Sequence, residues 1–138
     1  MRIKHPKNVI LGHLNINSMR YKHKFITEMI NKNIDAMIFT ETKLDNTFTT
    51  SQFYIEGYKI PYRRDRQFNG GGGILVYIND DISSRQLKDI SHPTDIELLV
   101  IELNLKKKRW LLFACYHPPS QCSSYFLSEI GKVIDHYS

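Results

Sequence analysis

The chain has 138 residues, which suits one domain or part of one, and its 41% hydrophobic and 12% aromatic content is typical of a globular rather than a disordered protein. Nineteen Lys and Arg against fourteen Asp and Glu give a net charge of +5, a moderate basic excess that fits a polyanion such as nucleic acid as partner. No apolar run approaches the ~20 residues of a membrane span, so no membrane partner is expected. Cys115 and Cys122 lack the spacing of a zinc site, and the basic N-terminus is not followed by a signal-type cleavage site. These features predict reduced thiols in an intracellular protein, nuclear or cytoplasmic.

The first third of the chain predicts a βαβ unit. Residues 9–16 form an apolar run typical of a buried strand, and residues 35–40 form a second one. Between them, residues 21–33 carry apolar side chains at helical spacing: Phe25, Ile26, Met29 and Ile30. Strand, helix and strand at this spacing predict a parallel pair with a right-handed crossover.

The rest of the chain predicts further strands and one helix. Residues 41–73 are irregular, with short strand candidates near Tyr54 and Lys59, and residues 74–78 form a buried strand. Residues 96–105 and 109–116 are strands joined by a short basic turn, which predicts an antiparallel hairpin. Helical spacing resumes over 125–137, with Ser123 or Ser124 as the expected N-cap.

Together these elements predict an α/β fold with a mixed β-sheet and helices on one face. Only two helices are available for strands that read as buried on both faces. We therefore expect a partner, or a further part of a larger fold, to cover one face of the sheet.

Polar groups follow three of the predicted strands. The first ends in Asn15 and Asn17, the second is followed by Glu41, and the last ends in Tyr116. In open α/β sheets the ligand lies at the carboxyl ends of the strands, and oxygen ligands of this kind suit Mg²⁺. Each residue also has a structural interpretation: Asn15 could satisfy a turn, Glu41 could begin a solvated loop, and Tyr116 could pack at the edge of the core.

Three other stretches have competing interpretations. The run Gly70–Gly73 lacks the Lys-Ser/Thr of a phosphate-binding P-loop and precedes a strand, so a turn or bulge is the better interpretation. The arginines of residues 62–66 could position a phosphate backbone or form a surface ion-pair cluster. The basic residues 106–109 read most simply as a solvated hairpin tip.

Taken in order, five stretches of the chain resemble a known family: "LNINS" from residue 14, "TETKLD" from residue 40, "YRRDR" with the following "GGGGILVYI", "IELLVIEL" and "WLLFACYHPPS". They resemble the endonuclease/exonuclease/phosphatase family, and more closely the apurinic-type endonuclease domains of non-LTR (LINE-like) retrotransposons. The resemblance runs from about residue 8 to the C-terminus. It implies a four-layer α/β sandwich and a metal-dependent phosphodiesterase that cuts DNA, with Mg²⁺ or Mn²⁺ and no small-molecule cofactor.

The resemblance also implies roles for individual residues. Asn15 matches the asparagine of the first motif, Glu41 the main metal-binding glutamate, and Tyr116 the tyrosine that contacts the scissile phosphate. Asn17 falls where some relatives carry a second polar metal ligand. The candidate contacts to nucleic acid are the basic side chains of the two stretches above: Arg63, Arg64, Arg66, Lys106, Lys107, Lys108 and Arg109.

The chain departs from this family downstream of the tyrosine. The family's Asp-x-Asn motif and its later Ser-Asp-His motif are not found in residues 1–138, and the pair Asp135 and His136 lies on a predicted helix. We therefore expect a partial domain, the N-terminal half of the sandwich, that needs the missing C-terminal half for activity. The alternative is a non-catalytic truncated remnant with at most weak binding to nucleic acid. A third reading is a phosphatase or exonuclease of the same family that acts on small phosphoesters.

Overall fold

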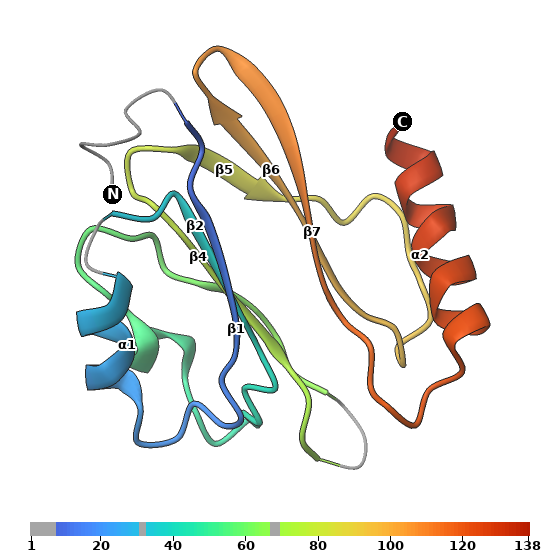
Figure 1. Ribbon diagram of the computed structural model, residues 1–138, viewed down its shortest axis with the longest axis horizontal. Helices are drawn as coiled ribbons and strands as arrows, with labels where there is room; N and C mark the ends of the chain where they lie inside the picture. The colour runs from blue at the N-terminus through green and yellow to red at the C-terminus, as the bar shows by residue number, and fades with distance from the viewer. Residues whose placement is uncertain (1–7, 31–32, 67–69) are drawn as a thin grey trace.

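The computed structural model describes residues 8–30, 33–66 and 70–138, which form four layers (Figure 1). Helix α1 (His23–Ile30) lies on the outer face of a four-stranded sheet, a three-stranded sheet follows, and helix α2 (Ser123–Tyr137) lies on the far side. The predicted α/β class is confirmed. The strands belong to two facing sheets, so the expected placement of both helices on one face is corrected: each helix covers the outer face of its own sheet.

The four-stranded sheet contains the predicted βαβ unit. Its order is β1 (Leu11–Asn15), β2 (Ala36–Thr40), β4 (Ile74–Ile78) and β3 (Tyr62–Arg64). Strands β1 and β2 are parallel, whereas β4 is antiparallel to both β2 and β3, so the sheet is mixed as predicted. Helix α1 is shorter than the predicted 21–33, of which residues 31 and 32 lie outside the described residues.

The three-stranded sheet is antiparallel, in the order β5 (Ser83–Gln86), β6 (Glu97–Leu105) and β7 (Lys108–Tyr116). The predicted hairpin of β6 and β7 is confirmed. Its turn consists of Lys106 and Lys107, whose φ angles of 55° and 63° are those of a two-residue hairpin turn with both central residues left-handed.

Three apolar clusters hold the layers together. Strand β4 shows the pattern, because Ile74, Val76 and Ile78 face the second sheet while Leu75 and Tyr77 face α1. A third cluster joins the outer face of β6 to α2. Each side chain buried in this way contributes roughly 1.5–3 kcal/mol relative to exposure. Because each sheet covers the other, the expected shortage of covering elements does not apply to β4, which is buried along its whole length.

Several local expectations differ from the structure. The strand candidate near Tyr54 is instead the end of a 3₁₀ helix, η1 (Thr50–Phe53), and Lys59 follows a single bridge between Tyr58 and Asn79. Strands β3 and β5 were not predicted, because both are short and polar. The N-cap of α2 is Cys122 rather than a serine, and it makes no side-chain capping bond.

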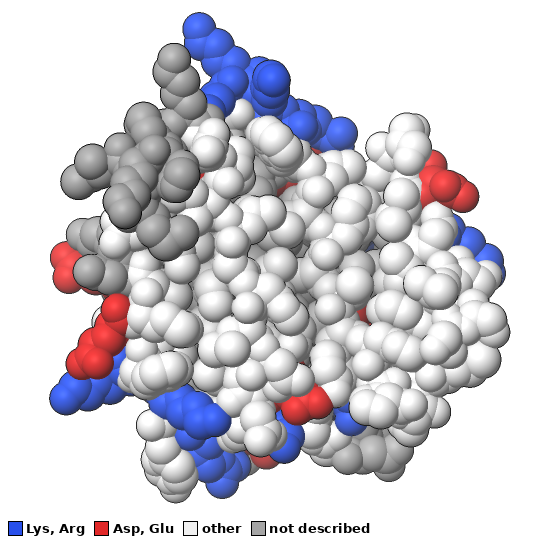
Figure 2. Space-filling view, viewed as in Figure 1, with Lys and Arg blue, Asp and Glu red and all other residues white. Residues whose placement is uncertain are grey.

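One side of the sandwich is open, between β1 and β7. The β1 side chains that face the second sheet are exposed, with Leu11 at 55%, and Trp110 of β7 is 45% exposed. A groove of about 570 Å³ lies between these strands and is lined by both residues. The face viewed in Figure 2 carries few charges across its middle, and its Lys and Arg side chains lie around the margin, mainly at the top and the lower left. No helix in the described part of the chain is long and apolar enough to cross a bilayer.

Candidate active site

Three strand ends meet at one rim of the sandwich. Because β1 and β2 are parallel, their carboxyl ends lie at the same edge of the sheet. Asn15 is the last residue of β1 and pairs with Thr40, and Glu41 is the next residue after β2. Tyr116, the last residue of β7, reaches this point from the other sheet, and its hydroxyl donates a hydrogen bond to Glu41 Oε1. The fold therefore brings Tyr116 and Glu41 into contact and places Asn15 beside them by strand register.

The contact between Tyr116 and Glu41 raises the pKa of the phenol. The hydrogen bond to Glu41, together with burial, raises the pKa of Tyr116 to about 12 from its ordinary value near 10. The hydroxyl therefore remains a hydrogen-bond donor to Glu41 over a wider range of alkaline pH than a free tyrosine would. The Asn15 side chain is exposed, and its Oδ1 accepts the backbone N–H of Asn17 at 3.1 Å.

The backbone of Glu41 is held in a strained conformation. Its φ is 54°, a left-handed value that residues other than glycine rarely adopt. The carbonyl of Glu41 accepts the N–H of Ser18 at 2.7 Å, and the next residues bond to the glycine run, with Lys43 N 2.8 Å from Gly72 O. Strain of this kind persists only where the surroundings impose it, and it concentrates at functional sites.

Glu97 is a second carboxylate near the rim, and the sequence reasoning did not single it out. It begins β6, is paired with Tyr116 across the β6–β7 ladder and is only 2% exposed. Its Oε1 accepts the N–H of Gly73 at 2.7 Å, while its Oε2 accepts Arg66 Nη2 at 2.8 Å and Nε at 3.2 Å. A glutamate inside an apolar strand is the signal that could have identified it, because a buried carboxylate is almost always paired.

The glycine run lies between Glu97 and the loop that carries Glu41. A side chain at Gly72 would place its Cβ 2.5 Å from both Arg66 Nε and Glu97 Oε1, and one at Gly73 would overlap the hydroxyl of Thr42. Both glycines have positive φ, at 57° and 98°. These positions therefore require glycine for close approach, and the run leads directly into β4.

The three arginines near the end of β3 differ in what they bind. Arg63 is occupied within the protein: it donates two hydrogen bonds to Asp65, at 2.8 and 2.7 Å, and one to each of the carbonyls of Asp45 and Phe48, both at 2.7 Å. Arg66 is bound to Glu97. Among the described residues, the Arg64 side chain donates one hydrogen bond, from Nη2 to Thr94 O at 3.0 Å, and its buried Nε has no partner there.

The basic hairpin turn lies far from the rim. Lys106, Lys107 and Lys108 are at the opposite end of β7 from Tyr116, and the nine-residue strand places them roughly 27 Å away. Arg109 is bound to Glu102 at 2.6 Å. The fold therefore does not bring this turn together with Glu41 and Tyr116.

The rim offers few ligands for a metal ion. The described residues contain no cluster of three or more His, Cys, Asp and Glu side chains able to hold a metal. Glu41 Oε2 accepts no hydrogen bond from any described residue, whereas Asn17 Oδ1 accepts the ammonium group of Lys43 at 2.6 Å. One open carboxylate fits Mg²⁺, which binds through one or two carboxylates and keeps waters and substrate phosphate as its other ligands. The Lys43 ammonium group at Asn17 is unfavourable for a second ligand there.

Comparison with known proteins agrees with this arrangement at the level of the fold. No protein-family model and no curated protein matches the chain. The solved endonuclease domain of TRAS1, a telomere-specific non-LTR retrotransposon, matches with a TM-score of 0.68 at 11% identity, over 95% of this chain and 54% of that domain. An AP endonuclease from Archaeoglobus fulgidus matches with a TM-score of 0.54 at 19% identity, over 93% of this chain and 50% of that one.

The chain thus spans about half the length of the solved structures that it matches. The family resemblance in the sequence implied a four-layer α/β sandwich, and this prediction is confirmed for the fold. The chain has an endonuclease/exonuclease/phosphatase-like fold and contains one part of it.

Proposed function

We propose that this chain is the N-terminal part of a metal-dependent DNA endonuclease of the retrotransposon type. The observation that carries the proposal is the hydrogen bond between Tyr116 and Glu41, at the rim where β1, β2 and β7 end. The similarity to two endonucleases supports a nuclease-like fold. The net charge of +5 supports a polyanionic substrate.

Hydrolysis of a phosphodiester needs an aligned water, a base and groups that stabilise the developing charge. In our proposal Glu41, with Asn15 beside it, would hold Mg²⁺ or Mn²⁺, and the bound metal would supply positive charge at the phosphate oxygens. Tyr116 keeps its proton at neutral pH and orients the Glu41 carboxylate. The resemblance assigns the base and the second stabilising donor to the Asp-x-Asn and Ser-Asp-His motifs, which residues 1–138 lack.

We also propose that the C-terminal half of the domain completes the second sheet. The open side between β1 and β7 supports this, because the exposed apolar side chains of Leu11 and Trp110 line a groove between the two edge strands. A further strand beside β7 would bury them. A stabilising donor typically contributes about 10²–10³ to the reaction rate, and a general base about 10²–10⁴. Because residues 1–138 lack the motifs that would supply both groups, we expect the chain alone to cleave DNA only weakly.

The alternative function is a non-catalytic remnant that binds nucleic acid. The observation that favours it is the small number of metal ligands at the rim among the described residues. Metal binding and cleavage, measured separately, discriminate between the two proposals.

The test combines Mn²⁺ binding, measured by electron paramagnetic resonance, with nicking of supercoiled plasmid in Mg²⁺ and in EDTA. Glu41→Gln removes the proposed ligand, and Glu56→Gln is the matched control because Glu56 is an exposed carboxylate. We expect Glu41→Gln to weaken Mn²⁺ binding by about tenfold and to abolish Mg²⁺-dependent nicking, while Glu56→Gln changes neither.

Metal binding that is unchanged in Glu41→Gln would overturn the proposed metal site. Nicking that persists in Glu41→Gln would overturn the proposed catalytic role. A folded chain that binds nucleic acid but binds no Mn²⁺ through Glu41 and shows no nicking above the EDTA control would favour the remnant.

A further inference from the structure

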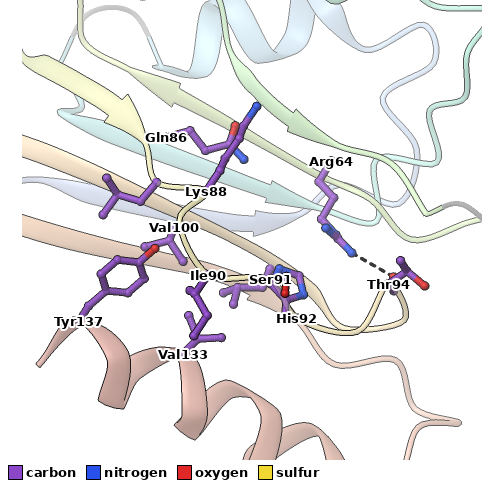
Figure 3. A pocket seen from close by; sticks show the side chains of 12 residues that line it. Arg64, Gln86, Lys88, Ile90, Ser91, His92, Thr94, Val100, Val133 and Tyr137 are labelled. Atoms are coloured by element: carbon purple, nitrogen blue, oxygen red, sulfur yellow. Dashed lines mark hydrogen bonds between the residues drawn. The ribbon is translucent and has the colours of Figure 1, made fainter.

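A cavity of about 320 Å³ lies between the outer face of β6, the segment that follows β5, and helix α2. Its floor is apolar and includes Val100 of β6 and Val133 of α2. Its wall carries the basic side chains of Arg64, Lys88 and His92, and none of its lining residues is Asp or Glu. Figure 3 shows Arg64 at one end of this cavity and Tyr137 at the other.

Arg64 has hydrogen-bonding capacity that the described residues do not use. A guanidinium group carries five N–H donors. Among the described residues, the Arg64 side chain donates one hydrogen bond, from Nη2 to the carbonyl of Thr94, and its buried Nε has no partner. Burial lowers the pKa of Arg64, which reflects a charged group partly removed from water. A buried cation is unfavourable unless an anion or further hydrogen bonds compensate for its charge.

The nearby carboxylates are already engaged. Glu97 is the charge that most favours the cationic form of Arg64, yet both of its oxygens are bound to Arg66 and to Gly73. Asp89 accepts hydrogen bonds from Tyr137 at 2.6 Å and from His136 at 3.0 Å, and it lines a neighbouring cavity instead. The positive wall of this cavity therefore has no counter-charge among the residues that line it.

We propose that this cavity is a phosphate-binding subsite with Arg64 as its anchor and Lys88 and His92 as further cationic contacts. The subsite would hold a backbone phosphate of the nucleic acid, an assignment that rests on the proposed endonuclease function. Among the three arginines of residues 62–66, Arg64 is the one that forms no ion pair with a described carboxylate, whereas Arg63 and Arg66 are bound to Asp65 and Glu97.

The position of Arg64 connects this subsite to the rim. Arg64 pairs with Ile74 at the start of β4, directly after Gly73, and Gly73 donates its N–H to Glu97. Glu97 in turn pairs with Tyr116. Arg64 therefore lies at the same end of the four-stranded sheet as Glu41, and in our proposal a phosphate of the backbone bound at the rim occupies the Arg64 subsite.

The test follows the side-chain Nε–H signal of Arg64 by ¹⁵N NMR in the 138-residue chain without metal. Arg64→Lys removes this signal and so assigns it. We expect a saturable shift on addition of inorganic phosphate, no comparable shift with sodium chloride at equal ionic strength, and displacement of phosphate by a short single-stranded DNA oligonucleotide.

Substitutions of single basic residues show how much each one contributes to the affinity for phosphate. Arg64→Gln should weaken phosphate binding by at least about tenfold, as expected from the loss of charge-assisted hydrogen bonds. Lys88→Gln changes an exposed side chain that does not contribute to the core, and it should weaken binding about threefold. Lys24→Gln removes one exposed positive charge from α1 and should have no effect.

A signal that does not respond to phosphate, or that responds equally to chloride, would overturn the subsite. A response to phosphate with none to the oligonucleotide would overturn its assignment to the DNA backbone. The measurement is made without metal and is repeated in Glu41→Gln. If DNA cleavage is not observed, the phosphate titration of Arg64 still stands as a test of the subsite. If phosphate does not bind at Arg64, Glu41-dependent nicking still stands as a test of the proposed function.

Discussion

The pairing of Glu97 with Arg66 gives the most direct test of how the rim is held. In Glu97→Ala, Arg66 loses two hydrogen bonds and its counter-charge, and the N–H of Gly73 loses its acceptor. Breaking a buried ion pair costs about 3–5 kcal/mol, and an orphaned backbone donor costs about 1–3 kcal/mol. The Arg66 side chain is 27% exposed and can turn toward water, so the lower end of both ranges applies. We expect a loss of about 4 kcal/mol in the free energy of unfolding.

Urea denaturation followed by circular dichroism measures this loss. Glu102→Ala is the matched control, because Glu102 lies on the same strand and is also bound by two arginines, Arg85 and Arg109, whose side chains are 70% and 53% exposed. Pairs with such exposed partners contribute little, so the control should lose much less stability. A double-mutant cycle with Arg66→Ala isolates the pair itself. Equal losses in the two glutamate variants, or a loss below about 1 kcal/mol at Glu97, would refute the reasoning.

Three further predictions concern the turn, the tyrosine and the hairpin. Gly73→Ala should lower the free energy of unfolding by at least about 2 kcal/mol in urea denaturation, because the φ of Gly73 is 98° and an added Cβ would overlap Thr42. Gly131→Ala is the control: Gly131 lies on α2 with open space around it, so this change should not destabilise the chain. The pKa of Tyr116 is raised to about 12 in the folded protein. The contribution of this shift to the free energy of unfolding is complete below the unfolded pKa near 10 and is lost as the pH rises through 12. In Tyr116→Phe, absorbance titration should show one fewer tyrosine ionising near pH 12, and an unchanged titration would contradict this. Lys107→Gly should raise the free energy of unfolding by about 1 kcal/mol, because glycine adopts the φ of 63° without strain, and any loss of stability would argue against the strain.

Part of the site was predictable because it depends on local pattern. Apolar runs located β1, β2 and β4, and helical spacing located α1 and α2. The short connection between β1 and β2 through a helix predicts that they are parallel, so Asn15 and Glu41 were expected at one edge before any tertiary contact was known. The turn of Lys106 and Lys107 likewise predicts the β6–β7 hairpin, because so short a connection permits only antiparallel strands.

Other features depend on contacts between residues distant in the sequence. Periodicity does not distinguish a strand covered by a helix from one covered by a second sheet, so the division into two facing sheets was implied by the family resemblance and not by the apolar pattern. The contact of Tyr116 with Glu41, which are 75 residues apart, appears only in the tertiary structure.

The sequence alone is enough to locate the strand ends that carry Asn15, Glu41 and Tyr116, because the alternation and length of the apolar runs are local properties. It also showed a cluster of three arginines, and an isolated cluster of like residues gives no information on which partners each one finds. The packing of the two sheets pairs Arg66 with Glu97 and leaves the Nε of Arg64 without a partner among the described residues. The physical reason is that ion pairing depends on distances across two sheets, which are set by packing rather than by order along the chain.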